Sequence, residues 1–238
     1  METITLIKKI LNIKLSFLET TWAINKKKFE SNTFEVAQKN NISIILSELL
    51  LKREVKNIKS FLSSKLKDNI SFNEIEKLEN INSSLKFFEE IKNLKKVGIF
   101  SDYDVDGACS AAILKKYLSQ FDIKVEVYIP NRITEGYGPN KKAIQKLLEK
   151  NKHVIFLDCG SNSIIEQDII TKNKSKLLII DHHECDQINQ NVILINPKSK
   201  LDKSNFNDLC TTALVFLVVF YLTRKEIFSN NDVFQYLD

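Results

Sequence analysis

The chain has few of the residues that interrupt regular structure. Its 238 residues include five glycines and three prolines, and none of these eight residues precedes Gly98. The four cysteines are scattered without a Cys-x-x-Cys pair, so a disulfide framework is not indicated. We therefore expect ordinary reduced cysteines, as in intracellular proteins.

The sequence also lacks an N-terminal signal peptide and a long apolar run. Its start, METITLIKKILNIK, has no apolar h-region. The most apolar stretch, residues 209–222, is too short to cross a bilayer comfortably and is better interpreted as a buried core helix. A formal net charge of +5 is a mild basic excess that indicates a polyanionic partner only weakly. We expect a cytoplasmic, monomeric protein without membrane contact.

Residues 1–95 show helical periodicity. Apolar residues recur at spacings of three and four, as in the series Ile42, Ile45, Leu46, Leu49 and Leu50. The single tryptophan, Trp22, is expected to be a packing residue. The sequence predicts a helical N-terminal region over residues 1–95.

From residue 96 the pattern changes to short apolar runs that alternate with amphipathic segments. Strands are predicted at 97–101, 124–129, 154–157, 177–180 and 192–195, and helices at 108–120, 140–151 and 163–172. Such alternation is typical of an α/β fold, a mostly parallel sheet with helices on both faces. We assign residues 96–238 to this second domain.

Acidic and imidazole side chains follow three of the predicted strands. Asp102, Asp104 and Asp106 lie in DYDVDG after the first strand, and Asp158 lies in LDCG after the third. Asp181, His182 and His183 lie in IDHHE after the fourth. Because ligands of open α/β sheets bind outside the carboxyl ends of the strands, these side chains are expected to meet at one crevice.

Several carboxylates with a neutral imidazole favour hard or borderline ions such as Mn²⁺ or Mg²⁺. Two such ions could generate a nucleophile and stabilise the leaving oxygen of a phosphodiester, with Asp158 as the candidate bridging ligand. His183 could then hydrogen-bond a phosphate oxygen, and Asp181 could orient a histidine. The alternative is a set of helix caps and solvated loop acids, which applies most readily to Asp102. His153, at the start of a strand, is expected to be structural.

The loop IPNRITEGYGPN, residues 129–140, carries two further candidates. Arg132 suits bidentate contact with a phosphate, and Tyr137 could stack on a base. The alternative is a surface loop with an exposed arginine.

The motifs DYDVDG, PNR…EGYG, LDCG, IDHHE and INPK, in this order, resemble the DHH phosphoesterase superfamily. More narrowly, they resemble the RecJ family of single-strand-specific 5′→3′ exonucleases. The resemblance implies two Mn²⁺ or Mg²⁺ ions, with metal ligands at Asp104, Asp106, Asp158 and His182. It also implies that His183 contacts the phosphate and that Arg132 helps to hold the 5′ phosphate end. Together with the reasoning from the residues, we expect catalytic roles for His183, Asp158 and Asp102, and substrate binding by Arg132, Tyr137 and His183.

The implied activity is exonucleolytic hydrolysis of single-stranded DNA with a 5′ phosphate, in DNA repair and recombination. A helicase or a single-strand-binding protein is a candidate partner. The chain departs from the family pattern at Ser101 and Ala213, where glycine is usual. We also expect the DHH domain to be incomplete at its C-terminus, without its last metal-binding aspartate, so that this chain alone is weak or inactive.

Two alternatives remain open on the sequence. One is a DHH-family phosphodiesterase of short oligonucleotides or cyclic dinucleotides. The other is a non-catalytic RecJ-like scaffold that binds DNA or replication proteins. A substrate comparison would separate the first alternative, and a Mn²⁺ titration would separate the second.

Overall fold

The computed structural model describes residues 29–63, 71–186, 189–228 and 232–236. The chain divides into two compact units between Asn69 and Ile70, and each unit is treated by itself. The expectation for Trp22 lies outside the described residues.

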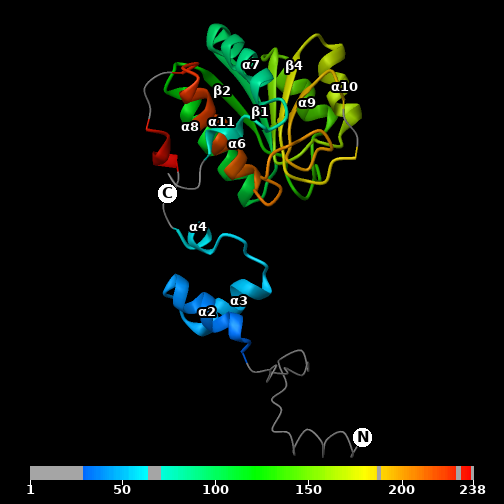
Figure 1. The fold of residues 1–238 in the computed structure, drawn as a ribbon. Helices are drawn as coiled ribbons and strands as arrows, with labels where there is room; N and C mark the ends of the chain where they lie inside the picture. The colour runs from blue at the N-terminus through cyan, green and yellow to red at the C-terminus, as the bar shows by residue number, and fades with distance from the viewer. Residues whose placement is uncertain (1–28, 64–70, 187–188, 229–231, 237–238) are drawn as a thin grey trace, which may run out of the picture. The chain divides into compact units, whose positions relative to one another are not determined.

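The first unit is helical over its described part, which confirms the prediction there. Asn41, in the left-handed conformation with φ 53°, ends one helix, and the side chain of Ser43 caps the next by accepting from Leu46 N at 3.2 Å. The hydroxyl of Ser47 donates to the carbonyl of Thr33 at 2.8 Å across the helix pair. The helices of this unit are α2 (Ser31–Asn40), α3 (Ile44–Lys52) and α4 (Ile58–Leu62) (Figure 1).

The second unit is built on a five-stranded sheet in which every pair of neighbours is parallel. The order is β2-β1-β3-β4-β5. Each strand coincides with one of the five predicted apolar runs, so the predicted parallel sheet is confirmed. The strands are β1 (Lys96–Ser101), β2 (Lys124–Tyr128), β3 (His153–Leu157), β4 (Lys176–Ile180) and β5 (Ile193–Ile195).

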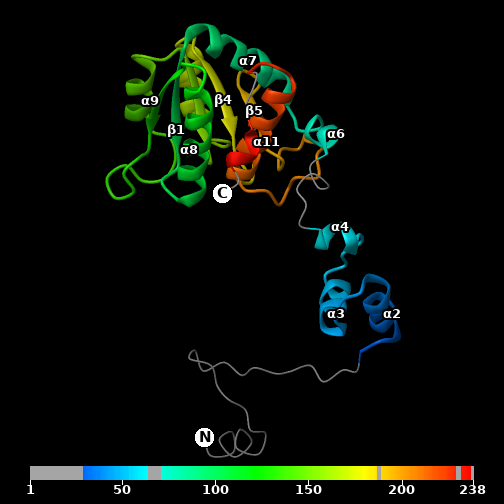
Figure 2. The ribbon, with the colours of Figure 1, turned by 90° about the vertical axis from the view of Figure 1, so that its left-hand side faces the viewer.

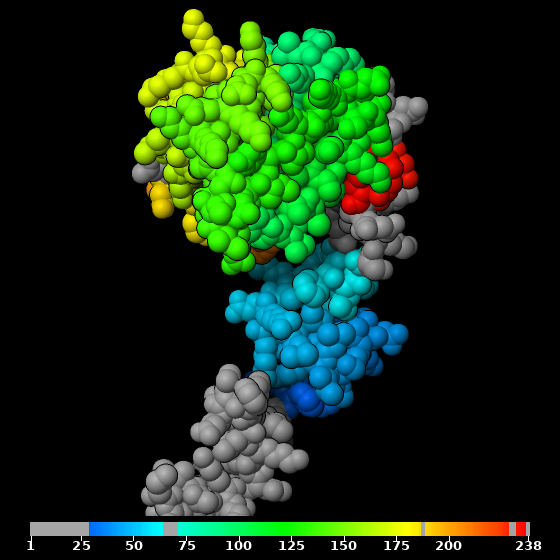
Figure 3. Space-filling view, turned by 180° about the vertical axis from the view of Figure 1, so that it is seen from behind, coloured from blue at the N-terminus to red at the C-terminus, as the bar shows by residue number. Residues whose placement is uncertain are grey.

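Helices cover both faces of this sheet, as the sequence predicted (Figures 1 and 2). On one face, Phe100, Phe156 and Ile179 of the strands form a buried cluster with Ile144 and Ile170 of two helices. Those helices are α9 (Lys141–Leu148) and α10 (Ile164–Lys172). Seen from behind, the green segment from β2 to α9 and the yellow of α10 form much of this unit's surface (Figure 3). The opposite face carries α7 (Ile81–Leu94), α8 (Val105–Ser119) and α11 (Thr211–Arg224).

The helix before the first strand belongs to the sheet-bearing unit. α7 buries Phe87, Phe88 and Ile91 and packs against β1, β4 and β5, and the short α6 (Phe72–Ile75) packs on α11. The change of sequence pattern at residue 96 therefore marks the first strand, while the compact unit begins before it.

The apolar run near the C-terminus forms α11, which is buried over Leu214–Leu222 and packs on α8. This agrees with the prediction of a core helix. Among the helices in the described ranges, none has both the length and the apolar character that crossing a membrane requires. A short 3₁₀ helix, η1 (Val233–Tyr236), packs on α11.

Candidate metal centre

Each acid that follows a strand is tied to the neighbouring strand by its own backbone N–H. Asp102 donates to Leu157 O at 3.2 Å, Asp158 to Ile180 O at 3.0 Å and Asp181 to Ile195 O at 3.1 Å. These acids are therefore fixed at the carboxyl edge of the sheet. The chain order reverses between β1 and β3, and a sheet of this kind leaves a crevice at that point.

The turn after β1 differs from the prediction in one respect. α8 begins at Val105, so the predicted start at residue 108 is wrong by three residues, and Asp106 lies in the first helical turn. Asp104 is the N-cap, and its Oδ1 accepts from Gly107 N at 3.0 Å. A capping aspartate stabilises the start of a helix, so the chain can pass from the strand into the helix without a longer loop.

Gly107 is required by the closeness of the backbone. A Cβ at this position would lie 2.4 Å from Asp102 O, well inside van der Waals contact. The hydroxyl of Ser101 donates to Gly107 O at 2.7 Å and adds a second link between the strand and the helix. The unusual serine before the DYD motif is thus accommodated by a hydrogen bond.

We call the carboxyl edge of the sheet, where these acids lie, the rim. Asp158 is an acid of the rim with a strongly raised pKa. It is 1% exposed and has a left-handed backbone with φ 62°, a strained conformation for a residue other than glycine. Its Oδ1 accepts from Thr211 Oγ1 at 2.9 Å, whereas Oδ2 is buried without a hydrogen-bond partner in the described structure. Burial and the nearby Asp106 carboxylate raise the pKa of Asp158 to about 8.

The N-terminus of α11 holds the side chain of Asp106. The backbone N–H groups of Thr211 and Thr212 donate to its two oxygens at 2.8 and 2.7 Å, and the hydroxyl of Thr212 donates to Oδ1. Burial alone would raise the pKa of Asp106, but these hydrogen bonds outweigh burial and hold it below its usual range. Sequence reasoning missed both threonines, although two hydroxyl residues at the start of the most apolar run are an N-terminal helix signal.

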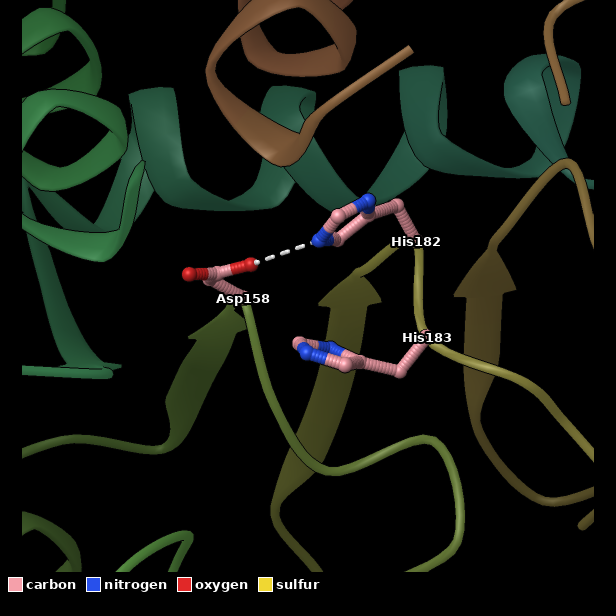
Figure 4. Close-up of side chains that lie close together, drawn as sticks. All are labelled: Asp158, His182 and His183. Atoms are coloured by element: carbon pink, nitrogen blue, oxygen red, sulfur yellow. Dashed lines mark ion pairs between the residues drawn. The ribbon is translucent and has the colours of Figure 1, made fainter. Parts of the chain in front are cut away.

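His182 faces the two acids of the rim. Its Nε2 lies 3.5 Å from Asp158 Oδ1 and 3.7 Å from Asp106 Oδ2. Figure 4 shows the imidazole on the loop after β4, directed toward Asp158 at the end of β3. An imidazole and two carboxylates thus converge from β3, α8 and the loop after β4, as expected of metal ligands.

His183 points to a different partner. Its Nδ1 donates to Asp181 Oδ1 at 2.7 Å, and Asp181 also accepts from the backbone N–H groups of His182 and His183. The carboxylate of Asp181 raises the pKa of His183 above its usual value. Burial opposes ionisation of Asp181, but hydrogen bonds from His183 and Ser161 lower its pKa to about 2. Asp181 therefore stays ionised and orients His183, so that Nε2 is turned away from Asp181.

Asn196 of the INPK motif holds the backbone at His183. Asn196 is fully buried, and its Nδ2 donates to Ser161 Oγ and to the carbonyl of His183, both at 2.9 Å. Sequence reasoning used Asn196 only as part of a motif. Its position directly after an apolar strand is the same signal that identified the acids.

Two overlapping groups of side chains have ligand atoms within 4.8 Å of one another. One is Asp102, Asp104 and Asp158, and the other is Asp158, His182 and His183. Asp158 belongs to both, and a second buried oxygen, Asp102 Oδ1, also lacks a partner in the described structure. Burial raises the pKa of Asp102 as well. Buried carboxylate oxygens without hydrogen-bond partners, close to an imidazole, fit a hard or borderline divalent cation.

The loop between β2 and α9 reaches the same rim. The guanidinium of Arg132 lies over the ring of Tyr103 at 5.4 Å, and the hydroxyl of Tyr137 lies 3.5 Å from His183 Nε2. Tyr137 is 58% exposed, but partial desolvation of its hydroxyl and the nearby Asp181 carboxylate raise the pKa of the phenol. Arg132 and Tyr137, both proposed to bind substrate, thus lie beside the candidate metal ligands.

Sequence comparisons identify relatives of this chain. The sequence model of the N-terminal domain of the DHH family matches residues 96–236. The chain is 30% identical over 148 residues to the single-stranded-DNA-specific exonuclease RecJ of Bacillus subtilis, covering 60% of this chain and 19% of that protein. It is 25% identical over 194 residues to a putative prophage-derived single-strand DNA-specific exonuclease, YorK, of the same organism, covering 81% of this chain and 32% of that one.

Solved structures show the same fold. A structure of RecJ with Mn²⁺ from Thermus thermophilus matches with a TM-score of 0.63 at 17% identity, covering 82% of this chain and 27% of that one. A structure of exonuclease RecJ bound to manganese matches with a TM-score of 0.57 at 23% identity, covering 62% of this chain and 38% of that one. The chain therefore spans between 19% and 38% of the length of these four proteins.

Proposed function

Because the chain belongs to the DHH family, we propose that it forms the metal-binding part of an exonuclease that hydrolyses single-stranded DNA from a 5′ phosphate end. The observation that carries this proposal is that Asp158 shares one group of close ligand atoms with Asp102 and Asp104, and a second group with His182 and His183. The named activity of the RecJ and YorK relatives supports the choice of substrate. A role in DNA repair and recombination is part of the same proposal.

The ligands proposed for two ions, Mn²⁺ or Mg²⁺, are Asp104, Asp106, Asp158 and His182. The buried Oδ2 of Asp158, which lacks a hydrogen-bond partner in the described structure, supports this assignment, because a bound cation would favour the charged form of a carboxyl that burial otherwise keeps protonated. When bound, such a pair of ions supplies an activated water and stabilises the charge on a leaving oxygen.

The chain's own residues orient the phosphate and its surroundings. The carboxylate of Asp181 holds His183 through Nδ1, so that Nε2 is presented to a non-bridging phosphate oxygen. Thr211 and Thr212 fix the carboxylates of Asp158 and Asp106 before any ligand binds. This preorganisation lowers the reorganisation that ligand binding requires.

The rest of the substrate would be held by the loop between β2 and α9. Arg132 carries a fixed positive charge that suits the terminal phosphate. Tyr137 is proposed to contact the end nucleotide, either through its ring or through the phenol beside His183.

The first test is isothermal titration of the chain with Mn²⁺. We expect tight binding in the wild type, retained in Glu89→Gln, which removes an exposed carboxylate of α7, and lost in Asp158→Asn. Equal binding by the wild type and Asp158→Asn would contradict the assigned centre. A chain that does not bind Mn²⁺ would favour the non-catalytic scaffold.

The second test compares substrates, with the chain alone and with any longer protein in which it occurs. We expect Mn²⁺- or Mg²⁺-dependent release of mononucleotides from single strands with a 5′ phosphate, and little release from duplex DNA. Preference for dinucleotides over long single strands would favour the small-nucleotide phosphodiesterase. Undiminished strand degradation by Asp158→Ala would contradict the mechanism.

A further inference from the structure

The loop between β2 and α9 contains an acid that is unexpected in a phosphate-binding segment. Glu135 lies three residues after Arg132, yet its carboxylate is turned to donors from its own surroundings. Tyr128 OH donates to Oε1 at 2.6 Å, and Asn131 N donates to Oε2 at 2.9 Å. Asn140 Nδ2, at the start of α9, lies 3.4 Å from Oε1.

These contacts join the two ends of the loop to its middle. Tyr128 is the last residue of β2 and Asn140 is the N-cap of α9, so one carboxylate links both flanking elements. The pKa of Glu135 lies below its usual range because the backbone N–H of Asn131 and the phenol of Tyr128 donate to it. The negative charge of Glu135 is thus stabilised by hydrogen bonds from the loop and from the end of β2.

The side-chain oxygen of Asn131 is a second acceptor within the loop. Asn131 Oδ1 accepts from the backbone N–H groups of Ile133 and Thr134 at 3.0 and 3.1 Å, and Glu135 N donates to Asn131 O at 2.8 Å. The backbone on both sides of Arg132 is therefore held by hydrogen bonds within the loop. Side-chain bonds of this kind fix a turn without regular secondary structure.

The side chain of Arg132 is held from the opposite side, by the turn after β1. Its guanidinium lies 5.4 Å from the centre of the Tyr103 ring, within the range of a cation–π contact. The same ring lies edge to face with Tyr137 at 6.5 Å. Tyr103 is flanked by Asp102 and Asp104, so this contact ties the loop to the candidate metal centre.

We propose that Glu135 and Tyr103 are positioning residues that hold Arg132 in place as a preformed receptor for the terminal phosphate of a nucleic acid strand. The proposal rests on the proposed function and deepens it, because it names how the strand end is recognised. Glu135 fixes the backbone around Arg132, and Tyr103 fixes the guanidinium. An arginine already held in its bound geometry loses less conformational entropy on binding phosphate than one on a mobile loop.

The experiment measures the ratio of two affinities by fluorescence anisotropy with the 238-residue chain. The probes are a short single-stranded oligodeoxythymidylate with a 5′ phosphate and the same strand with a 5′ hydroxyl, both with phosphorothioate linkages to slow cleavage. We expect the wild type to prefer the phosphorylated strand and Arg132→Ala to lose that preference.

The positioning variants should reduce this preference while leaving the fold and Mn²⁺ affinity unchanged. We expect Tyr103→Leu and Glu135→Ala each to lower the ratio about fivefold, in line with a cation–π contact and lost preorganisation. Tyr103→Phe keeps the ring and should keep the ratio. Glu149→Ala removes an exposed acid at the end of α9 and is the matched control.

A second readout tests the loop without any nucleic acid. Hydrogen exchange of the amides of Asn131, Ile133 and Thr134 should accelerate about tenfold in Glu135→Ala and stay unchanged in Tyr103→Leu. If Glu135→Ala does not fold, Tyr128→Phe removes one donor to the same carboxylate and should produce the smaller change in the same direction.

The outcomes separate the inference from the proposed function. A ratio that Arg132→Ala abolishes but Tyr103→Leu and Glu135→Ala leave intact overturns the inference alone. A wild type without preference for the 5′ phosphate overturns the recognition of a phosphorylated end and the inference with it. Loss of the ratio in Tyr103→Phe as well as Tyr103→Leu would also contradict the role of the ring.

Discussion

The two ends of the parallel sheet both carry a cluster of ionisable side chains, but the clusters are built differently. At the amino end, Glu90 of α7 meets His153 and Lys176, the first residues of β3 and β4. At the carboxyl end, the acids of the rim meet His182. The amino-end cluster combines opposite charges, whereas the carboxyl-end cluster is mostly acidic.

In the amino-end cluster, Glu90 is paired with both basic side chains. Glu90 accepts from His153 Nε2 at 2.7 Å and from Lys176 Nζ at 2.6 Å, and the hydrogen bond from Lys176 is the main cause of its lowered pKa. His153 is buried and packs edge to face on Phe87. The expectation that His153 is structural agrees with this placement far from the rim.

At the carboxyl end, the pKa of Asp158 is instead raised to about 8. The comparison teaches that a cluster which the chain neutralises by itself holds elements together, whereas one left short of positive charge is suited to a cation from solution. A shifted pKa therefore identifies a candidate site only when the direction of the shift and the neighbouring charged groups are considered as well.

The largest expected difference between the two ends is in metal binding. Asp158→Asn should weaken Mn²⁺ binding at least about 100-fold, because it removes the carboxylate common to both ligand groups. Glu90→Gln should leave Mn²⁺ affinity unchanged. Isothermal titration of both variants is the check, and equal losses in the two would remove the distinction between the clusters.

The second difference is in the pH dependence of stability without metal. The folded pKa of Asp158, about 8, lies above its unfolded value of about 3.9, so its contribution is fully present below about pH 4 and is lost as pH rises toward 8. Asp158→Asn lacks this loss. Its free energy of unfolding relative to wild type should therefore rise by a few kcal/mol from about pH 5 to about pH 8.

Urea denaturation in the presence of a chelator measures this difference. Glu89→Gln is the control and should show no such trend relative to wild type. A flat difference for Asp158→Asn across the same range would mean that the Asp158 carboxyl ionises without cost in the folded state.

A smaller effect is expected where α11 supports the rim. Thr212→Val keeps the shape of the side chain but removes the hydroxyl that donates to Asp106, so Mn²⁺ affinity should fall about tenfold. Thr171→Val, which removes a hydroxyl bonded within α10, should have no effect on affinity. Unchanged Mn²⁺ binding in Thr212→Val would exclude this hydroxyl from orienting the ligands.

The smallest expected effect is at the amino end. Glu90→Gln leaves Lys176 and His153 without their charged partner and should lower the free energy of unfolding by about 1 kcal/mol at neutral pH. Because a lowered carboxyl pKa stabilises above its unfolded value, the deficit should shrink as pH falls through the folded pKa of Glu90. Thermal denaturation at two pH values checks it.

Much of the candidate site could be predicted because it follows local patterns. Asp102, Asp158 and Asp181 each come directly after an apolar run, and a strand end is visible in the sequence. The start of α8 was misjudged because Asp104 acts as a helix cap as well as a candidate ligand. The threonines of α11 were missed because their partner Asp106 lies 105 residues away from Thr211 in the chain.

The sequence by itself determined the alternation of strands and helices and placed the acids at strand ends, because both depend on periodicity over a few residues. Only the tertiary structure decided that β1 lies between β2 and β3, that α11 presents its N-terminus to Asp106, and that Lys176 neutralises Glu90. These depend on which surfaces pack together across long stretches of chain. As a result, Glu90 at the amino end of the sheet has basic partners, whereas Asp158 at the carboxyl end lies beside another carboxylate, that of Asp106.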